Sequence, residues 1–255
     1  MKEVFRFSFS RTFLALFISF AGASCIAAEL TIAAPNAVKD AVMKAAERFQ
    51  QSTGDRVVFI WSGTEAITKR VSDGDRFDVV LNTSTSIDKL TAESHLSPGS
   101  RVDFANSSIG VAVRAGSPKP DIKTVEGLKA ALLSSKSIAI SSGTSGRHLT
   151  EVFAKLGIAD QLKTKIKQPP SGAQIGDLIA DGSAEIGFQQ VSELVHAKGV
   201  DYVGPLPTEI QSVTTYSAGL HAKSAKQDTA KRFMKILADS ESAAAITKSG
   251  LQAIP

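Results

Sequence analysis

The chain contains 255 residues, of which 43% are apolar and 21% charged, with 19 glycines and 9 prolines. This composition is typical of a globular protein with one large or two small domains, and it excludes collagen-like, low-complexity and disordered chains. The formal net charge is only +4, 6% of the residues are aromatic, and the lysines and arginines form no dense cluster. The sequence therefore indicates no nucleic-acid partner.

Residues 1–28 are typical of a cleavable secretory signal peptide. They combine a basic start, an apolar stretch at 13–23 that is too short to span a bilayer, and small residues at 24–28. We therefore expect a periplasmic protein. A second interpretation makes Cys25 a lipid-attachment site, but Gly22 stands where such signals usually have an aliphatic residue. Because Cys25 is the only cysteine, we expect no disulfide and no thiolate metal site after cleavage.

After this leader, short β-rich runs alternate with amphipathic helical runs, which indicates an α/β protein with mostly parallel strands. A first strand is expected at 30–34 and a first helix at 38–49, with Asn36 as its N-cap and Gly54 as its stop. Further strands are expected at 56–61, 77–81, 109–113, 137–140, 185–188 and 202–203. Further helices are expected at 65–71, 125–133, 147–156, 174–180, 191–196, 226–239 and 241–248.

Two polar, serine-rich junctions suggest that the chain crosses twice between two lobes. They lie at 106–108 and 205–212, and each leads into a β-rich run. We expect one lobe to comprise 29–107 plus 208–255 and the other to comprise 108–207. A ligand would lie between them, where helix N-termini and the carboxyl ends of strands converge.

Four segments that join a predicted strand to the next helix are small and polar. They are 34–37, 62–64, 141–147 and 170–173. A helix start offers unpaired N–H groups, while Ser and Thr add donors and Gly permits close approach. Together the segments predict a cradle for an anion. The alternative is that their Ser, Thr and Asn side chains only cap the helices, which is the commonest use of such residues.

Arg147 begins a predicted helix, where a cation is unfavourable to the helix dipole. We expect an anion to offset it, and its guanidinium could bind a ligand carboxylate through two hydrogen bonds. The alternative is a solvated arginine on the outer side of the first turn. The adjacent His148 is either a proton-transfer group in the cleft or a surface helix residue.

No metal site or cofactor is predicted. The four histidines are scattered and form no His-x-x-x-His pair. The chain also lacks a Gly-x-Ser-x-Gly elbow, a phosphate loop and a dinucleotide fingerprint. The sequence therefore excludes the common serine-hydrolase and nucleotide-binding classes.

Five segments, taken in order, resemble the molybdate-binding-like branch of the type II periplasmic solute-binding proteins. They are 29–42, 61–64, 77–80, 153–157 and 185–190. The resemblance covers nearly the whole processed chain. It implies an α/β fold of two lobes that are joined by two crossover strands and close on an anion, with an ABC importer as the partner.

The resemblance also implies a changed specificity. Ala37 and Gln190 stand where molybdate binders of this branch have a serine and a tyrosine, whereas Thr64 matches their second-loop hydroxyl. A cradle that keeps its backbone donors but lacks two hydroxyls would suit a di- or tricarboxylate. The expected ligand-binding residues are Asn36, Ser62, Gly63, Thr64, Thr144, Ser145, Gly146, Arg147, Gly172, Ala173, Gln189 and Gln190.

Two functions follow from this resemblance. The first is a monomeric binding protein that captures a small anion for an ABC importer. The second is a cofactor-independent aconitate isomerase, since the same scaffold is known to carry this activity; it would move a proton across the allylic system of a bound tricarboxylate. Candidates for the acid/base group of such an enzyme are His148, Ser145, Thr64 and Tyr216.

Overall fold

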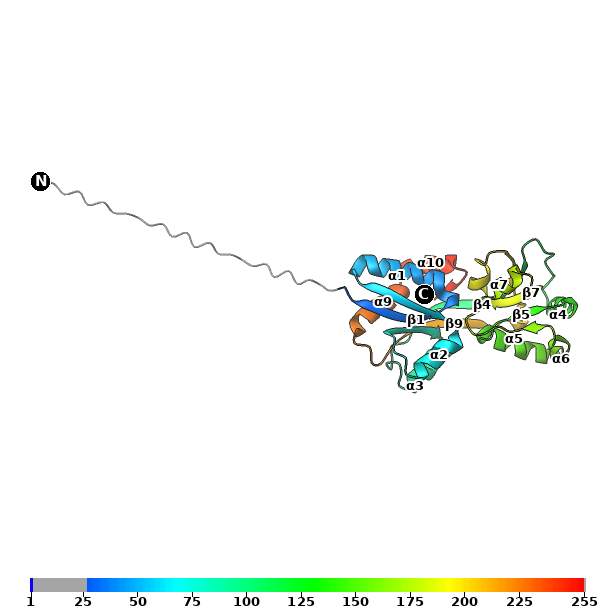
Figure 1. The fold of residues 1–255 in the computed structure, drawn as a ribbon, viewed down its shortest axis with the longest axis horizontal. Coiled ribbons are helices and arrows are strands. Elements are labelled where there is room, and N and C mark those ends of the chain that lie inside the picture. The colour runs from blue at the N-terminus through cyan, green and yellow to red at the C-terminus, as the bar shows by residue number, and fades with distance from the viewer. Residues whose placement is uncertain (2–26, 255) are drawn as a thin grey trace.

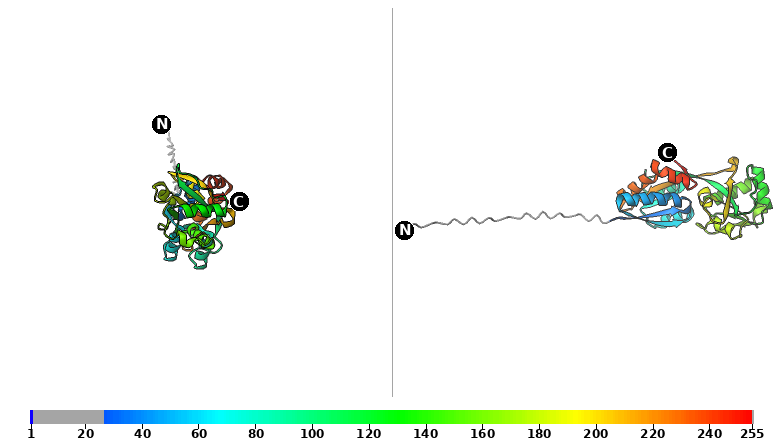
Figure 2. Two further views of the ribbon diagram at one scale, coloured as in Figure 1. Left: turned by 90° about the vertical axis from the view of Figure 1, so that its right-hand side faces the viewer. Right: turned by 90° about the horizontal axis from the view of Figure 1, so that it is seen from above.

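The computed structural model describes residue 1 and residues 27–254. Cys25 and nearly all of the expected signal peptide lie outside these residues. The described chain forms two lobes, with β4 and β9 running between them (Figures 1 and 2). No described helix combines the length and the apolar character that crossing a bilayer requires.

The first lobe is built on a sheet in the order β2-β1-β3-β9-β4. Strand β1 pairs in parallel with β2 and β3, and β9 pairs antiparallel with β3 and β4. Its elements are β1 (Glu29–Pro35), η1 (Asn36–Val38), α1 (Lys39–Thr53), β2 (Arg56–Ser62), α2 (Thr64–Ser72), β3 (Val79–Thr83), α3 (Ser84–Ala92), the first part of β4 (Val102–Arg114), β9 (Val213–Leu220), α9 (Gln227–Leu237), α10 (Ser240–Lys248) and β10 (Gln252–Ala253).

The second lobe continues the sheet with the order β4-β7-β5-β6, and β8 pairs with β4. Strand β5 is parallel to β6 and β7, while β4 is antiparallel to β7 and β8. Its elements are α4 (Val125–Ser134), β5 (Ile138–Ile140), α5 (Thr144–Lys155), α6 (Ala159–Leu162), β6 (Ile166–Lys167), α7 (Ile175–Ala180), β7 (Ile186–Gln190), α8 (Val191–Leu194), β8 (Val200–Pro205) and η2 (Thr208–Ile210).

Helix α1 illustrates how the sequence pattern produces the packing. Val42 and Phe49 lie on its buried face, where Phe49 meets Phe233 of α9 edge to face with ring centroids 5.7 Å apart. Gly54 ends the helix with φ of 76°, and its N–H donates to Gln50 O at 2.9 Å. Only glycine adopts this left-handed conformation without strain, so the predicted stop is confirmed.

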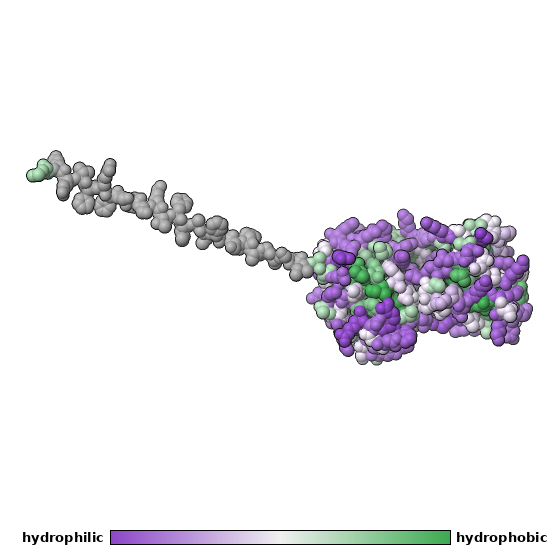
Figure 3. Space-filling view, viewed as in Figure 1, coloured by the Kyte–Doolittle hydropathy of each residue, from purple (hydrophilic) through white to green (hydrophobic). Residues whose placement is uncertain are grey.

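Each lobe has its own apolar interior. Buried side chains of the first lobe come from 30–105 and 216–251, and those of the second from 109–206. We therefore keep 29–107 with 208–255, and 108–207, as the proposed lobe limits. The face of the molecule seen in Figure 3 is mostly hydrophilic, as expected when apolar side chains pack in two interiors.

The connection between the lobes is made by crossover strands, as the resemblance implied, and the first junction lies within a strand. Residues 106–108 lie inside β4, a continuous strand whose first part pairs with β9 and whose last part pairs with β7 and β8. Gln211 ties the returning chain to this strand, since its side chain accepts from Ile109 N at 2.9 Å and donates to Ile109 O at 3.0 Å. The two crossings are thus hydrogen-bonded to each other.

Asn36 does not cap helix α1, contrary to our expectation. The helix begins at Lys39 after Val38, and no side chain caps either η1 or α1. Instead, Asn36 Nδ2 donates to Gly172 O of the second lobe at 3.0 Å. Asn36 thus makes a hydrogen bond between the lobes in place of the expected N-cap hydrogen bond.

Candidate functional site

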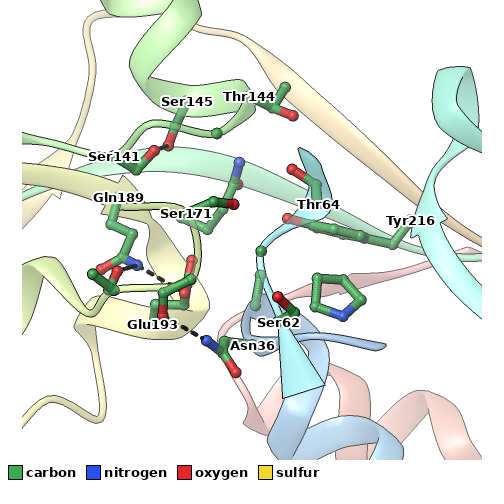
Figure 4. Close-up of a pocket in the computed structure, with 17 residues that line it drawn as sticks. Asn36, Ser62, Thr64, Ser141, Thr144, Ser145, Ser171, Gln189, Glu193 and Tyr216 are labelled. Atoms are coloured by element: carbon green, nitrogen blue, oxygen red, sulfur yellow. Dashed lines mark hydrogen bonds between the residues drawn. The ribbon is translucent and has the colours of Figure 1, made fainter. Parts of the chain in front are cut away.

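A cavity of about 50 Å³ lies between the lobes, beside the carboxyl ends of β1, β2, β5 and β7 (Figure 4). Sheets of this type place ligands at such strand ends, where helices begin. The residues that line the cavity are Pro35, Asn36, Ala37, Ser62, Gly63, Thr64, Ser141, Gly143, Thr144, Ser145, Ser171, Gly172, Ala173, Gln189, Gln190, Glu193 and Tyr216.

All four of the small polar segments contribute to this lining, as expected from their positions. The expected ligand-binding residues that line it are Asn36, Ser62, Gly63, Thr64, Thr144, Ser145, Gly172, Ala173, Gln189 and Gln190. Gly146, Arg147 and His148 are not among the lining residues. The binding roles of the lining residues stay predictions.

The helices that begin at the cavity offer free donors at their first turns. Gly63 and Gly143 precede α2 and α5, and neither helix has a side-chain cap. In contrast, Thr124 and Asp239 cap α4 and α10, which lie away from the cavity. The capping alternative therefore does not hold at α2. At α5 it holds only for the Gly146 N–H, which donates to Ser141 Oγ, and the other first-turn N–H groups are available to an anion.

The hydroxyl groups at the cavity are divided between two uses. Ser141 Oγ bonds to Ser145 Oγ at 2.8 Å and accepts from Gly146 N at 3.2 Å, so Gly146 N–H serves the loop rather than a ligand. The buried Ser171 Oγ has no partner among the described residues, nor has Gln190 Oε1. Buried polar atoms without partners are rare and are usually satisfied by water or by a ligand.

Glu193 at the start of α8 is an acid inside this anion cradle. Its Oε1 accepts from Gln189 Nε2 at 2.8 Å (Figure 4). Burial raises the pKa of Glu193 to about 8, against hydrogen bonds from Gln174 and Gln189 that lower it. Glu193 is therefore mostly protonated at neutral pH, and it then adds no charge that would repel an anion.

Tyr216 of β9 faces the same cavity from the first lobe (Figure 4). Its side chain is buried, and this burial, followed by the charge of Glu193, raises the pKa of Tyr216 well above its ordinary range. The phenol therefore stays protonated and can only donate to, or accept from, a ligand as a neutral group.

The lobes touch across the cavity, so the structure represents a closed arrangement. Asn36 bonds to Gly172, and Ser192 Oγ donates to Ala37 O at 2.7 Å. A Cβ atom added to Gly63 would lie 2.1 Å from Ser171 Oγ and 2.6 Å from Gly172 N. Closure thus brings backbone against backbone, and it depends on a glycine at this position.

Arg147 lies outside the cavity lining, and the anion that offsets it is Glu65 of the other lobe. The two side chains form an ion pair across the lobes, and they are 56% and 44% exposed. In this arrangement the guanidinium pairs with Glu65 and does not line the cavity, and its binding of a ligand carboxylate stays a prediction. The positive end of the α5 dipole also favours the carboxylate of Glu65 at this place.

We expect Arg147→Ala to change the free energy of unfolding by less than about 1 kcal/mol, because exposed ion pairs contribute little. Chemical denaturation of the variant and of Glu65→Gln would measure this. A loss above about 2 kcal/mol in either variant would show that the pair contributes more to stability than its exposure suggests.

His148 faces the returning crossover rather than the cavity. Its Nε2 hydrogen-bonds with Ile210 O at 2.8 Å. His148 therefore does not line the cavity in this arrangement, and its role as a proton-transfer group stays a prediction. The acid that does line the cavity, Glu193, was not predicted from the sequence, whereas Ser141, which follows β5, lies in the predicted segment 141–147.

Within residue 1 and residues 27–254, no group of three or more His, Cys, Asp or Glu side chains could hold a metal ion. The cavity offers hydroxyls, amides, backbone N–H groups and one carboxyl group. Such a donor set suits an anion rather than a cation.

Comparison with known proteins agrees with this architecture. Residues 30–252 match a family described as bacterial extracellular solute-binding protein. An aconitate isomerase from Pseudomonas sp is 32% identical over 232 residues, which cover 89% of this chain and 88% of that protein. The molybdate-binding protein ModA of Azotobacter vinelandii is 28% identical over 192 residues, which cover 74% and 75% of the two chains.

Solved structures show the same fold. The periplasmic molybdate-binding protein of Azotobacter vinelandii superposes with a TM-score of 0.75 at 23% identity, covering 89% of this chain and 99% of that one. The sulfate-binding protein SubI of Mycobacterium tuberculosis gives 0.73 at 18% identity, covering 89% and 87%. The predicted fold class and the resemblance to the molybdate-binding branch are thereby confirmed, and the chain belongs to the bacterial extracellular solute-binding protein family.

Proposed function

We propose that this protein captures a small carboxylate anion in the interlobe cavity, in the periplasm, and presents it to an ABC importer. The observation that carries the proposal is the uncapped starts of α2 and α5 beside the unpartnered hydroxyl of Ser171. These groups are hydrogen-bond donors that only an anion or water would satisfy. Membership of the solute-binding family supports the same function.

The proposed ligand is a di- or tricarboxylate rather than molybdate. The cavity lacks hydroxyl side chains at Ala37 and Gln190, and the Gln190 amide instead donates to Thr214 Oγ1 at 3.2 Å. A volume of about 50 Å³ holds only one or two water molecules, so the lobes must lie further apart around a bound tricarboxylate than they do in this arrangement. The sparse polar contacts between the lobes allow such opening.

A thermal-shift screen of the purified protein tests this proposal. We expect trans-aconitate, cis-aconitate or citrate to stabilise it by about 2.7 kcal/mol at a hundred times the dissociation constant. This corresponds to a rise in melting temperature of about 5–10 °C for a chain of this size. Stabilisation by molybdate, tungstate or sulfate alone would contradict the proposal.

A second function, aconitate isomerisation, is favoured by one specific observation: a carboxyl group whose pKa lies near the working pH faces the same cavity. A pure binding site for a polyanion has no need of such an acid, whereas an allylic proton shift requires one. The aconitate isomerase relative supports this candidate.

Incubation with one aconitate isomer separates the two functions. We expect the other isomer to accumulate until equilibrium if the protein is an isomerase, and the chromatographic separation of the two isomers measures it. Unchanged substrate after prolonged incubation with saturating protein would leave transport as the function.

A further inference from the structure

Glu193 faces two cavities at once. Besides the interlobe cavity, it lines a neighbouring one of about 450 Å³, here called the side cavity. The side cavity is lined by Asn36, Ala37, Lys39, Asp40, Gly172, Gln174, Gly176, Asp177, Ser192, Glu193, His196, Ala197 and Ser249. It lies between the start of α1 and helices α7 and α8.

The wall between the two cavities consists of the contacts that hold the lobes together. Asn36 and Gly172 line both cavities and are hydrogen-bonded to each other at 3.0 Å. Ser192 Oγ closes the same wall by donating to Ala37 O. When the lobes are closed, a ligand is therefore separated from the side cavity, whereas Glu193 lines both cavities.

Glu193 is the one lining residue of the described chain that is suited to act as an acid/base group. Among the described residues that line the interlobe cavity, only Glu193 and Tyr216 carry titratable side chains. The phenol of Tyr216 stays neutral, and serine or threonine hydroxyls cannot accept a proton from carbon without a base beside them. The carboxyl group is also held in position by Gln189 Nε2 at 2.8 Å.

We propose that Glu193 is the catalytic acid/base of an allylic isomerisation in this cavity, and that the side cavity connects it to solvent protons. The proposal rests on the second function proposed above. The ionised form of Glu193, which is the minority form at neutral pH, takes a proton from the methylene carbon of bound aconitate. The electron pair of that C–H bond forms the new double bond, and the pair of the old double bond takes the proton back at the far carbon.

This sequence of steps balances without an oxidant, a reductant or a cofactor. Glu193 is regenerated as a carboxylate, and the negative charge that develops on the substrate lies against the N–H groups of α2 and α5. The polar and charged groups that line the two cavities together with Glu193 include Gln174 and Asp177 of the α7 segment, Lys39 and Asp40 of α1, His196 after α8, and Tyr216 of β9.

Glu193→Gln tests the role of the carboxyl group, because glutamine keeps its shape and cannot take a proton. We expect the rate of conversion of trans-aconitate to fall by about 10²–10⁴, as is typical of lost acid/base catalysis. Binding of trans-aconitate, measured by calorimetry, should persist and thereby show that the variant is folded. Glu151→Gln, an exposed acid on α5, is the matched control and should convert at the wild-type rate.

The outcomes separate this inference from the function on which it rests. If the wild type does not convert aconitate, both the proposed isomerase function and the proposed role of Glu193 are wrong. If the wild type converts aconitate and Glu193→Gln does so at a rate within tenfold of it, the isomerase function is supported and the acid/base role of Glu193 is wrong.

A reaction in D₂O tests the link to solvent. We expect carbon-bound deuterium in part of the product, because Glu193 can exchange its proton through the side cavity during the reaction. Product that contains no carbon-bound deuterium would overturn the proposed connection.

Discussion

Gly63→Ala is expected to lower the affinity for trans-aconitate at least about 100-fold, which is about 2.7 kcal/mol. The added Cβ would lie 2.1 Å from Ser171 Oγ and 2.6 Å from Gly172 N, both of the opposite lobe. Backbone cannot give way as a flexible side chain does, so the lobes cannot approach each other as closely around a ligand as they do in the wild type. Because φ of Gly63 is −81°, alanine fits the local backbone, and the fold of each lobe should be unaffected.

Gly204→Ala in β8 provides a matched control outside the interlobe cavity. Its Cβ would lie 3.7 Å from Ile122 Cδ1, a distance that ordinary packing tolerates. Calorimetric titration of both variants, together with their melting temperatures without ligand, measures the difference. Wild-type affinity in Gly63→Ala, or an equal loss in Gly204→Ala, would contradict the importance of closure at Gly63.

The free energy of unfolding is expected to fall as the pH rises from about 4.5 to about 8, because of Glu193. In this window the folded chain holds a proton on Glu193, whereas the unfolded chain has released it, so higher pH favours unfolding. The effect amounts to about 1.4 kcal/mol for each pH unit. Stability conferred by protonated Glu193 is complete below pH 4.5 and is lost once the pH exceeds the folded-state pKa.

Urea denaturation of the wild type and of Glu193→Gln across this range measures the effect. The glutamine variant should match the wild type near pH 4 and should be more stable by several kcal/mol near pH 8. Subtracting one protein's free energy of unfolding from the other's removes the contributions of all other titrating groups. Asp239, whose pKa is about 2, does not titrate in this pH range. Parallel pH profiles would show that Glu193 is ionised normally in the folded protein.

Local sequence patterns were enough to predict a helix or strand that buries a regular apolar face. Helix α1 and its stop at Gly54 were predictable because apolar side chains recur at helical spacing and a glycine follows them. Helix α3 was missed because only Ile87 and Leu90 of its nine residues are buried apolar side chains, which is too few to reveal a period. The strand that spans both lobes was hidden by its polar middle, where Asn106 Oδ1 accepts from Thr215 Oγ1 at 2.8 Å.

The candidate site was predictable as a set of loops but not as a set of contacts. Small polar segments at helix starts indicated which loops face the cavity, since that depends on chain order in an α/β fold. The partner of Arg147, Glu65, lies 82 residues away, and no local pattern could reveal it. Glu193 was missed for the same reason. In the sequence it looks like a solvent-exposed acid of a short helix, and only the fold places it beside Tyr216 of β9 in one cavity.

The binding of a carboxylate anion between the lobes is tested most directly by a diffraction structure of the protein crystallised with trans-aconitate. We expect its carboxylate oxygens about 2.7–3.2 Å from the backbone N–H groups at the starts of α2 and α5, with both lobes contributing contacts. We also expect Ser171 Oγ to bond to the ligand. Trans-aconitate bound elsewhere on the molecule, or an interlobe cavity that takes up molybdate but excludes trans-aconitate at saturating concentration, would contradict the account.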